Sequence, residues 1–585
     1  MRKLMITQIS TTVRLRLSQS VCVFLFLAFG CEMLSPAQEL QSANAPQAQG
    51  LKPILSYISS AWDMLTRSMT ECQSVVDPKL KTPPVLYLPA NFPEPSAVRK
   101  LAADCNVQIE HLPKEIKSLG ELDTSTFQPQ GLLYLENKYV VPGGRFNEMY
   151  GWDSYFIIRG LLRAGRVELA RGMVDNFFFE VEHYGAMLNA NRTYYLTRSQ
   201  PPFLSSMFID VYTALQQTGH ADNTWLEKAY VDLVHDYTMW NVVPHLAGDT
   251  GLSRYYDFGE GPPAEAVQDE TGFYRKVATY FFFHPARADD YILESLPTAK
   301  LPTAGARYAL QVCDATSTVD TPVCEKAREF KLSPDYYKGD RSMRESGFDV
   351  SFRFGPFGAA THHYAAVCLN SLLYKTEKDL EQISRWLGHG ADAAWWSKKA
   401  EDRKKLITHY LWNPQQGMFF DYDFLTSQRS SYVYASTFYP LWAGLATPEQ
   451  AKAVVKNLSA LEKPGGIAMS TQDTGAQWDL PYGWGNIQML AIEGLRRYGY
   501  NTDADRISYE FLSMVAENFR RDRNIHEKYN VVTRSSEAHV QLGYQANVVG
   551  FGWTNAAFLE LLHALPKEMV ARLEKEQDQP IPESK

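Results

Sequence analysis

Two stretches of the chain combine aromatic, basic, amide and carboxylate side chains in a way that suits sugar chemistry. Residues 142–155 read PGGRFNEMYGWDSY, and residues 477–484 read QWDLPYGW. Tryptophan rings offer flat surfaces to the apolar face of a sugar, and guanidinium and amide groups offer planar hydrogen-bonding forks to its hydroxyls. The forks would come from Arg145, Asn189, Arg198 and Gln200, and the rings from Trp152, Trp478 and Trp484. The pattern predicts a site for a small neutral sugar; the alternative is that the glycines and prolines only shape loops and the tryptophans fill the core.

Hydrolysis is the reaction that such a site most directly suggests. A glycosidic bond is ordinarily cleaved by two carboxyl groups that flank it, one protonated as an acid and the other ionised as a base or nucleophile. The chain contains 66 aspartates and glutamates, and their periodicity selects no pair.

Both stretches closely resemble the two signature segments of trehalases, the glycoside hydrolases that cleave α,α-trehalose. The resemblance continues in the family's order through NANRTYYLTRSQPPF at 189–203, RESGFDVSFRFG at 344–355, HEKYNV at 526–531 and GFGWTN at 550–555. It implies an all-α fold, an (α/α)6 toroid barrel with long active-site loops. It also implies an enzyme that hydrolyses trehalose to two glucose molecules with inversion of anomeric configuration.

The resemblance assigns roles to individual residues as well. Asp349 in ESGFD matches the family's general acid, and Glu527 in HEKYN matches its general base. In an inverting reaction the base activates a water, and the two carboxyl groups lie roughly 6.5 to 9.5 Å apart. Matching positions imply that substrate is bound by Arg145, Trp152, Asp153, Asn189, Arg198, Ser199, Gln200, Glu265 and Gly347. No metal and no organic cofactor is implied.

The chain departs from the family pattern at several positions. Pro263 stands where the family has an arginine, so Arg254 and Arg287 become candidates for the missing guanidinium. Tyr544 stands near the place of a family glutamate, and Phe348 replaces a common tryptophan. These departures keep two alternatives open: a related helical-toroid α-glucosidase that acts on another α-linked glucoside, and a non-catalytic periplasmic trehalose-binding protein.

Other motifs add little. The sequence GEGPPA at 259–264 formally fits a dinucleotide fingerprint, but its two prolines remove backbone donors and no βαβ unit surrounds it. The adjacent pair His362 and His363 lacks spaced carboxylates, and ordinary packing is the favoured interpretation. The chain has no HExxH, no phosphate loop and no GxSxG elbow.

Helical periodicity predicts the elements that position these motifs. It runs through 156–177 and then through 206–218, 225–240, 360–375, 378–411, 432–445, 448–462, 485–499, 503–519 and 553–563. The helix predicted over 448–462 begins with Thr447-Pro-Glu-Gln450, which supplies a capping box and a proline in the first turn. Between the helices lie long loops rich in glycine, proline and aromatic residues, which are typical of functional sites. We expect one catalytic domain over 51–570, a flexible segment over 38–50 and a frayed tail over 571–585.

Composition excludes other classes of protein. The 585 residues are 45% hydrophobic, which excludes a disordered chain or a small disulfide scaffold. A net charge of −8 without basic runs gives no support for nucleic-acid binding. Composition favours a small partner that is weakly charged or neutral, the resemblance implies that it is trehalose, and the oligomeric state is left open.

The amino terminus predicts an export signal over residues 1–37. Basic residues precede ten apolar ones at 21–30, and Ala37 ends a small-residue cleavage pattern. We therefore expect an exported protein, periplasmic or secreted, without a membrane span; lipidation at Cys31 and an amphipathic first helix are alternatives. In an oxidising compartment Cys72 with Cys105, and Cys313 with Cys324, can form bridges, and buried thiols are an equal alternative.

Overall fold

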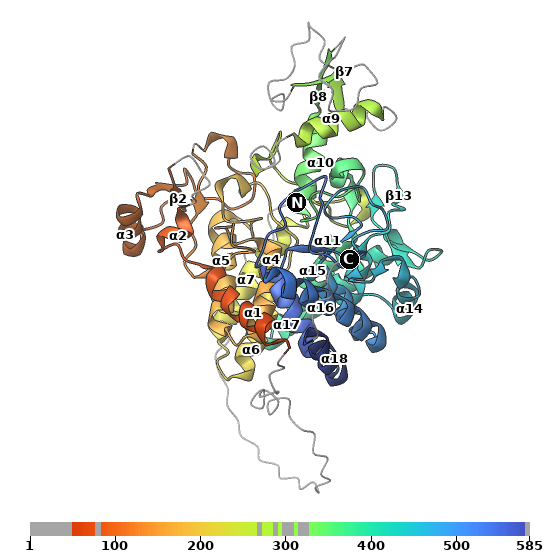
Figure 1. The fold of residues 1–585 in the computed structure, drawn as a ribbon. Coiled ribbons are helices and arrows are strands. Elements are labelled where there is room, and N and C mark those ends of the chain that lie inside the picture. The colour runs from red at the N-terminus through yellow and green to blue at the C-terminus, as the bar shows by residue number, and fades with distance from the viewer. Residues whose placement is uncertain are drawn as a thin grey trace. The chain divides into compact units, whose positions relative to one another are not determined.

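The computed structural model of the chain describes residues 50–76, 83–127, 129–265, 272–284, 291–294, 309–313 and 327–578. All of them belong to one compact unit that comprises residues 47–585 (Figure 1). The predicted export signal, Cys31 and residues 38–49 of the predicted flexible segment lie outside the described residues.

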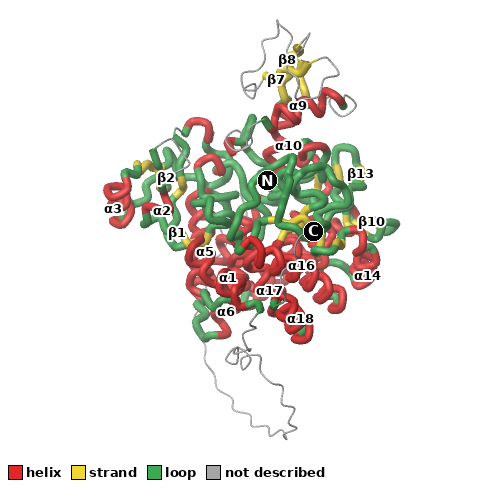
Figure 2. Tube along the Cα trace, in the orientation of Figure 1, coloured by secondary structure: helices red, strands yellow, loops and turns green. Residues whose placement is uncertain are grey.

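Six helices form a closed inner ring. Each packs against the next, and the last packs against the first, in the order α4 (Gly151–Arg163), α6 (Leu204–Gln217), α11 (Val367–Trp386), α13 (Tyr439–Trp442), α15 (Gly485–Arg497) and α17 (Gly552–Ala564). In the sequence these alternate with a second set: α1 (Lys52–Leu65), α5 (Val167–Tyr184), α7 (Asn223–Met239), α12 (Gly390–Tyr410), α14 (Pro448–Lys456) and α16 (Asn501–Asp522). This arrangement confirms the predicted all-α (α/α)6 toroid, and Figure 2 shows the long loops that join its helices.

Close packing in the ring depends on small residues. Gly160 of α4 faces α17, where an added Cβ would lie 2.8 Å from the Cβ of Ala556 and 2.8 Å from the ring of Trp62 on α1. These separations are shorter than ordinary van der Waals contacts, so glycine lets the three helices approach one another. Helix α17 is buried on most of its faces, as expected for an inner helix.

The remaining helices and strands are short. The helices are α2 (Cys72–Val75), α3 (Ser96–Cys105), α9 (Phe273–Phe283), α10 (Pro334–Glu345) and α18 (Lys567–Gln577). A parallel sheet contains β2 (Val85–Leu88), β3 (Gln108–His111) and β4 (Leu132–Leu133). The antiparallel partners are β1 (Thr66–Arg67) with β5 (Tyr139–Val140), β10 (Trp412–Asn413) with β11 (Met418–Phe419), β14 (Glu462–Lys463) with β15 (Gly466–Ile467), and β16 (Tyr482–Trp484) with β17 (Lys528–Asn530). Two antiparallel sheets of three strands comprise β9 (Tyr364–Ala365), β12 (Tyr422–Asp423) and β13 (Gln428–Arg429), and β6 (Ile292–Glu294), β7 (Ala309–Cys313) and β8 (Ala327–Leu332).

Local signals account for several helix boundaries. Both hydrogen bonds of the predicted capping box between Thr447 and Gln450 are present at the start of α14. The predicted helix over 378–411 is instead two helices, because Gly388 adopts φ +74° and the chain turns between α11 and α12. Helix α18 continues into the segment predicted to fray, since Leu573 is fully buried and α18 packs against α16.

The cores and cysteines complete the framework. One large apolar core fills the toroid. A smaller core joins α9 and α10 to Val350, which lies in the 344–355 motif, and to Ala476, which directly precedes the 477–484 motif. Cys72 and Cys105 form a disulfide with a Cα–Cα distance of 5.6 Å, whereas Cys324 lies outside the described residues. Among the described helices, none combines the length and the apolar character needed to cross a bilayer.

Candidate active site

A pocket that opens to solvent lies at the amino-terminal ends of inner helices. Trp152 and Trp553 belong to the first turns of α4 and α17, and Trp484 directly precedes α15. Helix amino termini carry partial positive charge and unpaired N–H groups, which suit a site that contains carboxylates and polar ligands. The ring thus brings together motifs that are about 400 residues apart in the chain.

The predicted site residues lie around this pocket with one exception. Its lining contains Asp349, Glu527, Arg145, Trp152, Asp153, Asn189, Arg198, Gln200, Glu265 and Gly347. Ser199 does not line it: its hydroxyl donates to the carbonyl of Met187 at 2.6 Å, and its N–H donates to Glu345 at 3.3 Å. Ser199 therefore holds the 187–200 loop in shape rather than facing the cavity.

Glu527 is held by contacts on both its backbone and its carboxylate. Its N–H donates to the carbonyl of Val548 at 2.8 Å, and its carbonyl accepts the indole N–H of Trp553 at 3.1 Å. The Oε2 atom accepts a hydrogen bond of 3.1 Å from the Nζ of Lys528. Lys528 is fully buried and its Nζ lies 5.1 Å from the ring centroid of Trp484. These contacts fix the direction of the carboxylate.

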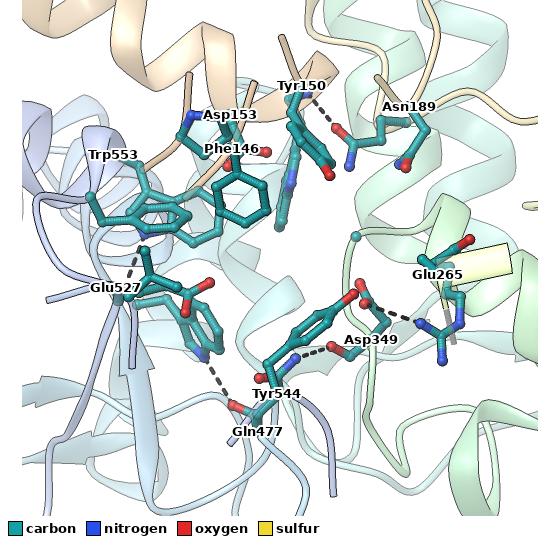
Figure 3. A pocket seen from close by; sticks show the side chains of 18 of the residues that line it. Phe146, Tyr150, Asp153, Asn189, Glu265, Asp349, Gln477, Glu527, Tyr544 and Trp553 are labelled. Atoms are coloured by element: carbon teal, nitrogen blue, oxygen red, sulfur yellow. Dashed lines mark hydrogen bonds and ion pairs between the residues drawn. The ribbon is translucent and has the colours of Figure 1, made fainter. Parts of the chain in front are cut away.

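Asp349 lies on the loop that follows α10, across the pocket from Glu527 (Figure 3). Its Oδ2 is 3.9 Å from the guanidinium of Arg344, and its backbone carbonyl accepts a hydrogen bond from the Gln477 side chain. Gly347 shapes this loop with φ +75°, and a Cβ there would lie 2.8 Å from the Trp152 ring. The loop that carries Asp349, called the acid loop after the predicted role of that residue, therefore packs directly against Trp152 of the 142–155 segment.

Asp153 is a third carboxyl group in the same pocket. It is only 4% exposed and lies in the first turn of α4. Burial, followed by the negative charges of Glu527 and Asp349, raises the pKa of Asp153 well above its usual value. The pocket thus favours the protonated form of Asp153, the form that can donate a hydrogen bond.

Arg198 and Glu265 form the polar side of the pocket. The guanidinium of Arg198 pairs with the carboxylate of Glu265, lies 3.5 Å from Asp257 and donates to the Asn189 side-chain oxygen at 3.3 Å. Burial alone would raise the pKa of Glu265, but the neighbouring Arg198 and Arg344 outweigh it and hold that pKa below its usual value. The pocket therefore shifts the pKa values of Glu265 and Asp153 in opposite directions, toward the ionised form of Glu265 and the protonated form of Asp153.

Aromatic rings cover much of the remaining wall. Trp478 and Trp484 stack with centroids 3.8 Å apart and planes 4° apart. Phe348 packs edge-on against Trp152 at 5.3 Å and against Trp478 at 5.2 Å, which accounts for an aromatic residue at this position. Trp553 lies 5.9 Å from Trp152 in the same cluster.

Several lining residues were not singled out from the sequence. They are Pro142, Phe146, Tyr150, Tyr195, Arg344, Gln477, Val548, Phe551 and Trp553, together with Tyr544, which had been noted only as a departure. Arg344 lies in the motif RESGFD and Trp553 in the motif GFGWTN, so membership of these motifs could have identified both as site residues. The Arg145 guanidinium lies 4.9 Å from the Phe146 centroid and 5.5 Å from that of Tyr544, so the departure at 544 contacts a predicted binding residue.

Arg254, suggested above as a replacement for the family arginine missing at Pro263, does not place its guanidinium in the pocket. Its guanidinium donates to the carbonyls of Pro244 at 2.8 Å and His362 at 2.7 Å, and it does not line the cavity. The other suggestion, Arg287, lies outside the described residues. Arg344 lines the pocket and supplies a guanidinium beside Asp349.

Comparison with known proteins decides the family. The family model named Trehalase matches residues 38–301 and 308–566. The chain belongs to the trehalase family. It is 36% identical to the cytosolic neutral trehalase of Saccharomyces cerevisiae over 558 residues, which cover 85% of this chain and 69% of that relative. It is 35% identical to the cytosolic neutral trehalase of Emericella nidulans, over 86% of this chain and 72% of that relative.

A solved structure agrees with this assignment. The neutral trehalase of Saccharomyces cerevisiae superposes with a TM-score of 0.72 at 32% identity, and the match covers 91% of this chain and 97% of that one. The predicted family, fold and glycoside hydrolase class are therefore confirmed.

The predicted location needs correction. The relatives just described are named cytosolic trehalases, and this contradicts the expected export signal and the periplasmic or secreted location. A basic start followed by a short apolar run is a weak local pattern, because an amphipathic helix produces it as well.

Proposed function

We propose that this trehalase hydrolyses α,α-trehalose to two glucose molecules with inversion, Asp349 acting as the general acid and Glu527 as the general base. The observation that carries the proposal is the placement of these two carboxyl groups on opposite sides of one aromatic pocket in a chain of this family (Figure 3). An acid and a base on opposite faces of the scissile bond are what single-step inversion requires.

In the proposed reaction Asp349 gives its proton to the bridging oxygen as the bond from that oxygen to the anomeric carbon breaks. Glu527 takes a proton from a water molecule, and the resulting hydroxyl bonds to the anomeric carbon from the opposite face. Trehalose and water thus become one β-glucose and one α-glucose. The Lys528 and Trp553 contacts orient Glu527 for this step.

The proposed binding roles follow from the chemistry of the lining. Arg145, Arg198, Asn189 and Glu265 would bind hydroxyl groups, and Asp153, whose raised pKa favours its protonated form, would donate to one. Trp152 would face a sugar ring, and Gly347 would allow the acid loop to approach it. Gln200 accepts the N–H of Trp152 at 2.9 Å, so we assign it to orienting α4 as well as to binding. Ser199 is assigned to loop geometry alone.

The test is glucose release from α,α-trehalose by purified protein, with Asp349→Asn and Glu527→Ala alongside. Both variants should keep the fold and lose nearly all activity, whereas Glu401→Gln, an exposed carboxylate on α12, should behave like the wild type. Proton NMR at the earliest times should show equal amounts of α- and β-glucose. Full activity in Asp349→Asn would refute the assignment of the acid, and two α anomers would refute inversion.

The departures at Pro263 and Tyr544 favour one competing function, hydrolysis of a different α-linked glucoside. Tyr544 lines the pocket and lies beside Arg145, so it can alter the second sugar position. Parallel assays on kojibiose and trehalose distinguish the two functions by their kcat/KM values. Trehalose binding without turnover by the wild type would instead support a binding protein.

A further inference from the structure

A cluster of possible metal ligands lies away from the pocket, at the start of α10. The Nε2 of His362 is 3.0 Å from the Oδ1 of Asp335, and the Nε2 of His363 is 3.8 Å from the same oxygen. In the part of the chain that the structure describes, the side chains of Asp335, His362 and His363 are placed so that they can share one ion. Their ligand atoms all lie within 4.8 Å of one another. From the sequence, ordinary packing was the favoured interpretation of the histidine pair, because Asp335 precedes His362 by 27 residues and no spacing rule connects them.

The backbone holds both histidines in place without using their rings. The carbonyl of His362 accepts a hydrogen bond from Arg254 at 2.7 Å, and the carbonyl of His363 accepts the N–H of Phe424 at 3.1 Å. The N–H of His363 donates to Ala360 at 2.8 Å. Both imidazoles are therefore presented from a fixed turn, and His362 is only 5% exposed.

Asp335 approaches from a second rigid element. It lies in the first turn of α10, where the Ser333 side chain caps the helix by accepting the Tyr336 N–H at 3.1 Å. Its side chain is 42% exposed, so the cluster has an open side toward solvent through which an ion can enter. The nearby guanidinium of Arg254 donates to the backbone oxygens of Pro244 and His362.

We propose that Asp335, His362 and His363 bind a first-row divalent cation of the Zn²⁺ type. Two imidazole nitrogens and one carboxylate oxygen are a donor set that Zn²⁺ takes, with solvent completing the coordination. Ligands about 2.0 to 2.1 Å from a tetrahedral ion lie roughly 3.3 Å from one another. The two distances to Asp335, 3.0 and 3.8 Å, bracket that value, and all three ligand atoms lie within 4.8 Å of one another, so the side chains would need to draw together around the ion.

The consequence of binding is structural rather than catalytic. Helix α10 ends at Glu345, four residues before Asp349, and Asp335 near its start lies roughly 15 Å from that end at 1.5 Å per residue. The ion would clamp the start of α10 to the 361–363 turn, which already packs against this helix. Occupancy should therefore stabilise the helix that leads into the acid loop, independently of the hydrolytic function.

The experiment uses the full, untagged chain after treatment with EDTA and dialysis. Calorimetric titration with ZnCl₂ should give one site, and Zn²⁺ should raise the midpoint of thermal unfolding. Asp335→Asn and His363→Gln should each weaken this binding by at least about tenfold, in line with losses seen when metal-site residues are altered. His389→Gln is the matched control, because His389 and Asp392 form an exposed pair 3.8 Å apart that lacks a second histidine. It should bind Zn²⁺ like the wild type.

A measurement on the wild type alone guards against misfolded variants. Zn²⁺ should protect His363 from diethyl pyrocarbonate, as read by peptide mass spectrometry, while the exposed His389 remains reactive. Absence of stoichiometric Zn²⁺ binding would overturn the proposal. So would binding that is unchanged in folded Asp335→Asn and His363→Gln, or equal modification of His363 with and without Zn²⁺.

Discussion

Lys528 offers the sharpest test of how the chain positions its proposed base. The change Lys528→Met keeps most of the apolar stem of this fully buried residue and removes one ammonium, 3.1 Å from the Glu527 carboxylate. A hydrogen bond to a charged group contributes about 2 kcal/mol, which corresponds to roughly a 30-fold effect on rate. We therefore expect kcat on trehalose to fall about 30-fold while KM changes little, because the carboxylate loses its fixed direction toward water.

Steady-state kinetics separates this effect from general damage. Lys338→Met is the control, since Lys338 is also a buried lysine, but its Nζ donates to the carbonyls of Asp257 at 2.9 Å and Gly259 at 2.8 Å, outside the pocket lining. That variant should lose stability with a smaller loss of kcat. The reasoning fails if Lys528→Met retains kcat within about twofold of the wild type, or if both variants lose kcat equally.

Three further predictions concern the framework. Gly347→Ala should lower kcat by about 100-fold, as measured with trehalose, because the new Cβ would lie 2.8 Å from Trp152 and displace the acid loop. Burial raises the pKa of Asp236, which accepts the Met187 N–H at 3.0 Å, to about 6. The folded state thus binds this proton more tightly, and the contribution of Asp236 to stability should fall by about 2 to 3 kcal/mol as pH rises from about 4 to above 6. Urea unfolding at pH 4 and 7.5 should show this loss shrink in Asp236→Asn, whose amide oxygen can still accept the hydrogen bond. Arg159→Met should lower the free energy of unfolding by about 3 kcal/mol, because carboxylates on α6, α15 and α17 lose their shared cation, and unchanged stability would refute that role.

Most of the helices were predicted from local periodicity, whereas the toroid was predicted only through the resemblance to the trehalase family. The capping box at Thr447 is a signal contained within four residues, and it was recovered in detail. The split at Gly388 was missed because apolar periodicity continues on both sides of the turn, and only the backbone angle reveals the break. The small parallel sheet was missed because β4 has two residues and β2 is buried along its whole length, so neither alternates.

The site was predictable where a motif carries it and unpredictable where distant loops meet. Asp349 and Glu527 were named through family resemblance, since no spacing rule selects two carboxyl groups 178 residues apart. The raised pKa of Asp153 comes first from burial and then from the charges of Glu527 and Asp349, and these arise only in the folded pocket. Arg254 could not be excluded from the sequence because its contacts also form only in the folded chain. Its guanidinium donates to the carbonyls of Pro244 and His362 and is thereby held outside the pocket.

The toroid separates the chemistry from much of what holds the ring together. The pocket lies at the amino-terminal ends of inner helices, whereas Arg159 lies two turns further along α4. There its guanidinium is 3.0 Å from Glu493, 2.9 Å from Glu560 and 3.6 Å from Asp210, which belong to three other inner helices. One cation thus joins four of the six inner helices beneath the site. Because none of these groups lines the pocket, its loss should loosen the ring while KM for trehalose stays the same in the molecules that remain folded.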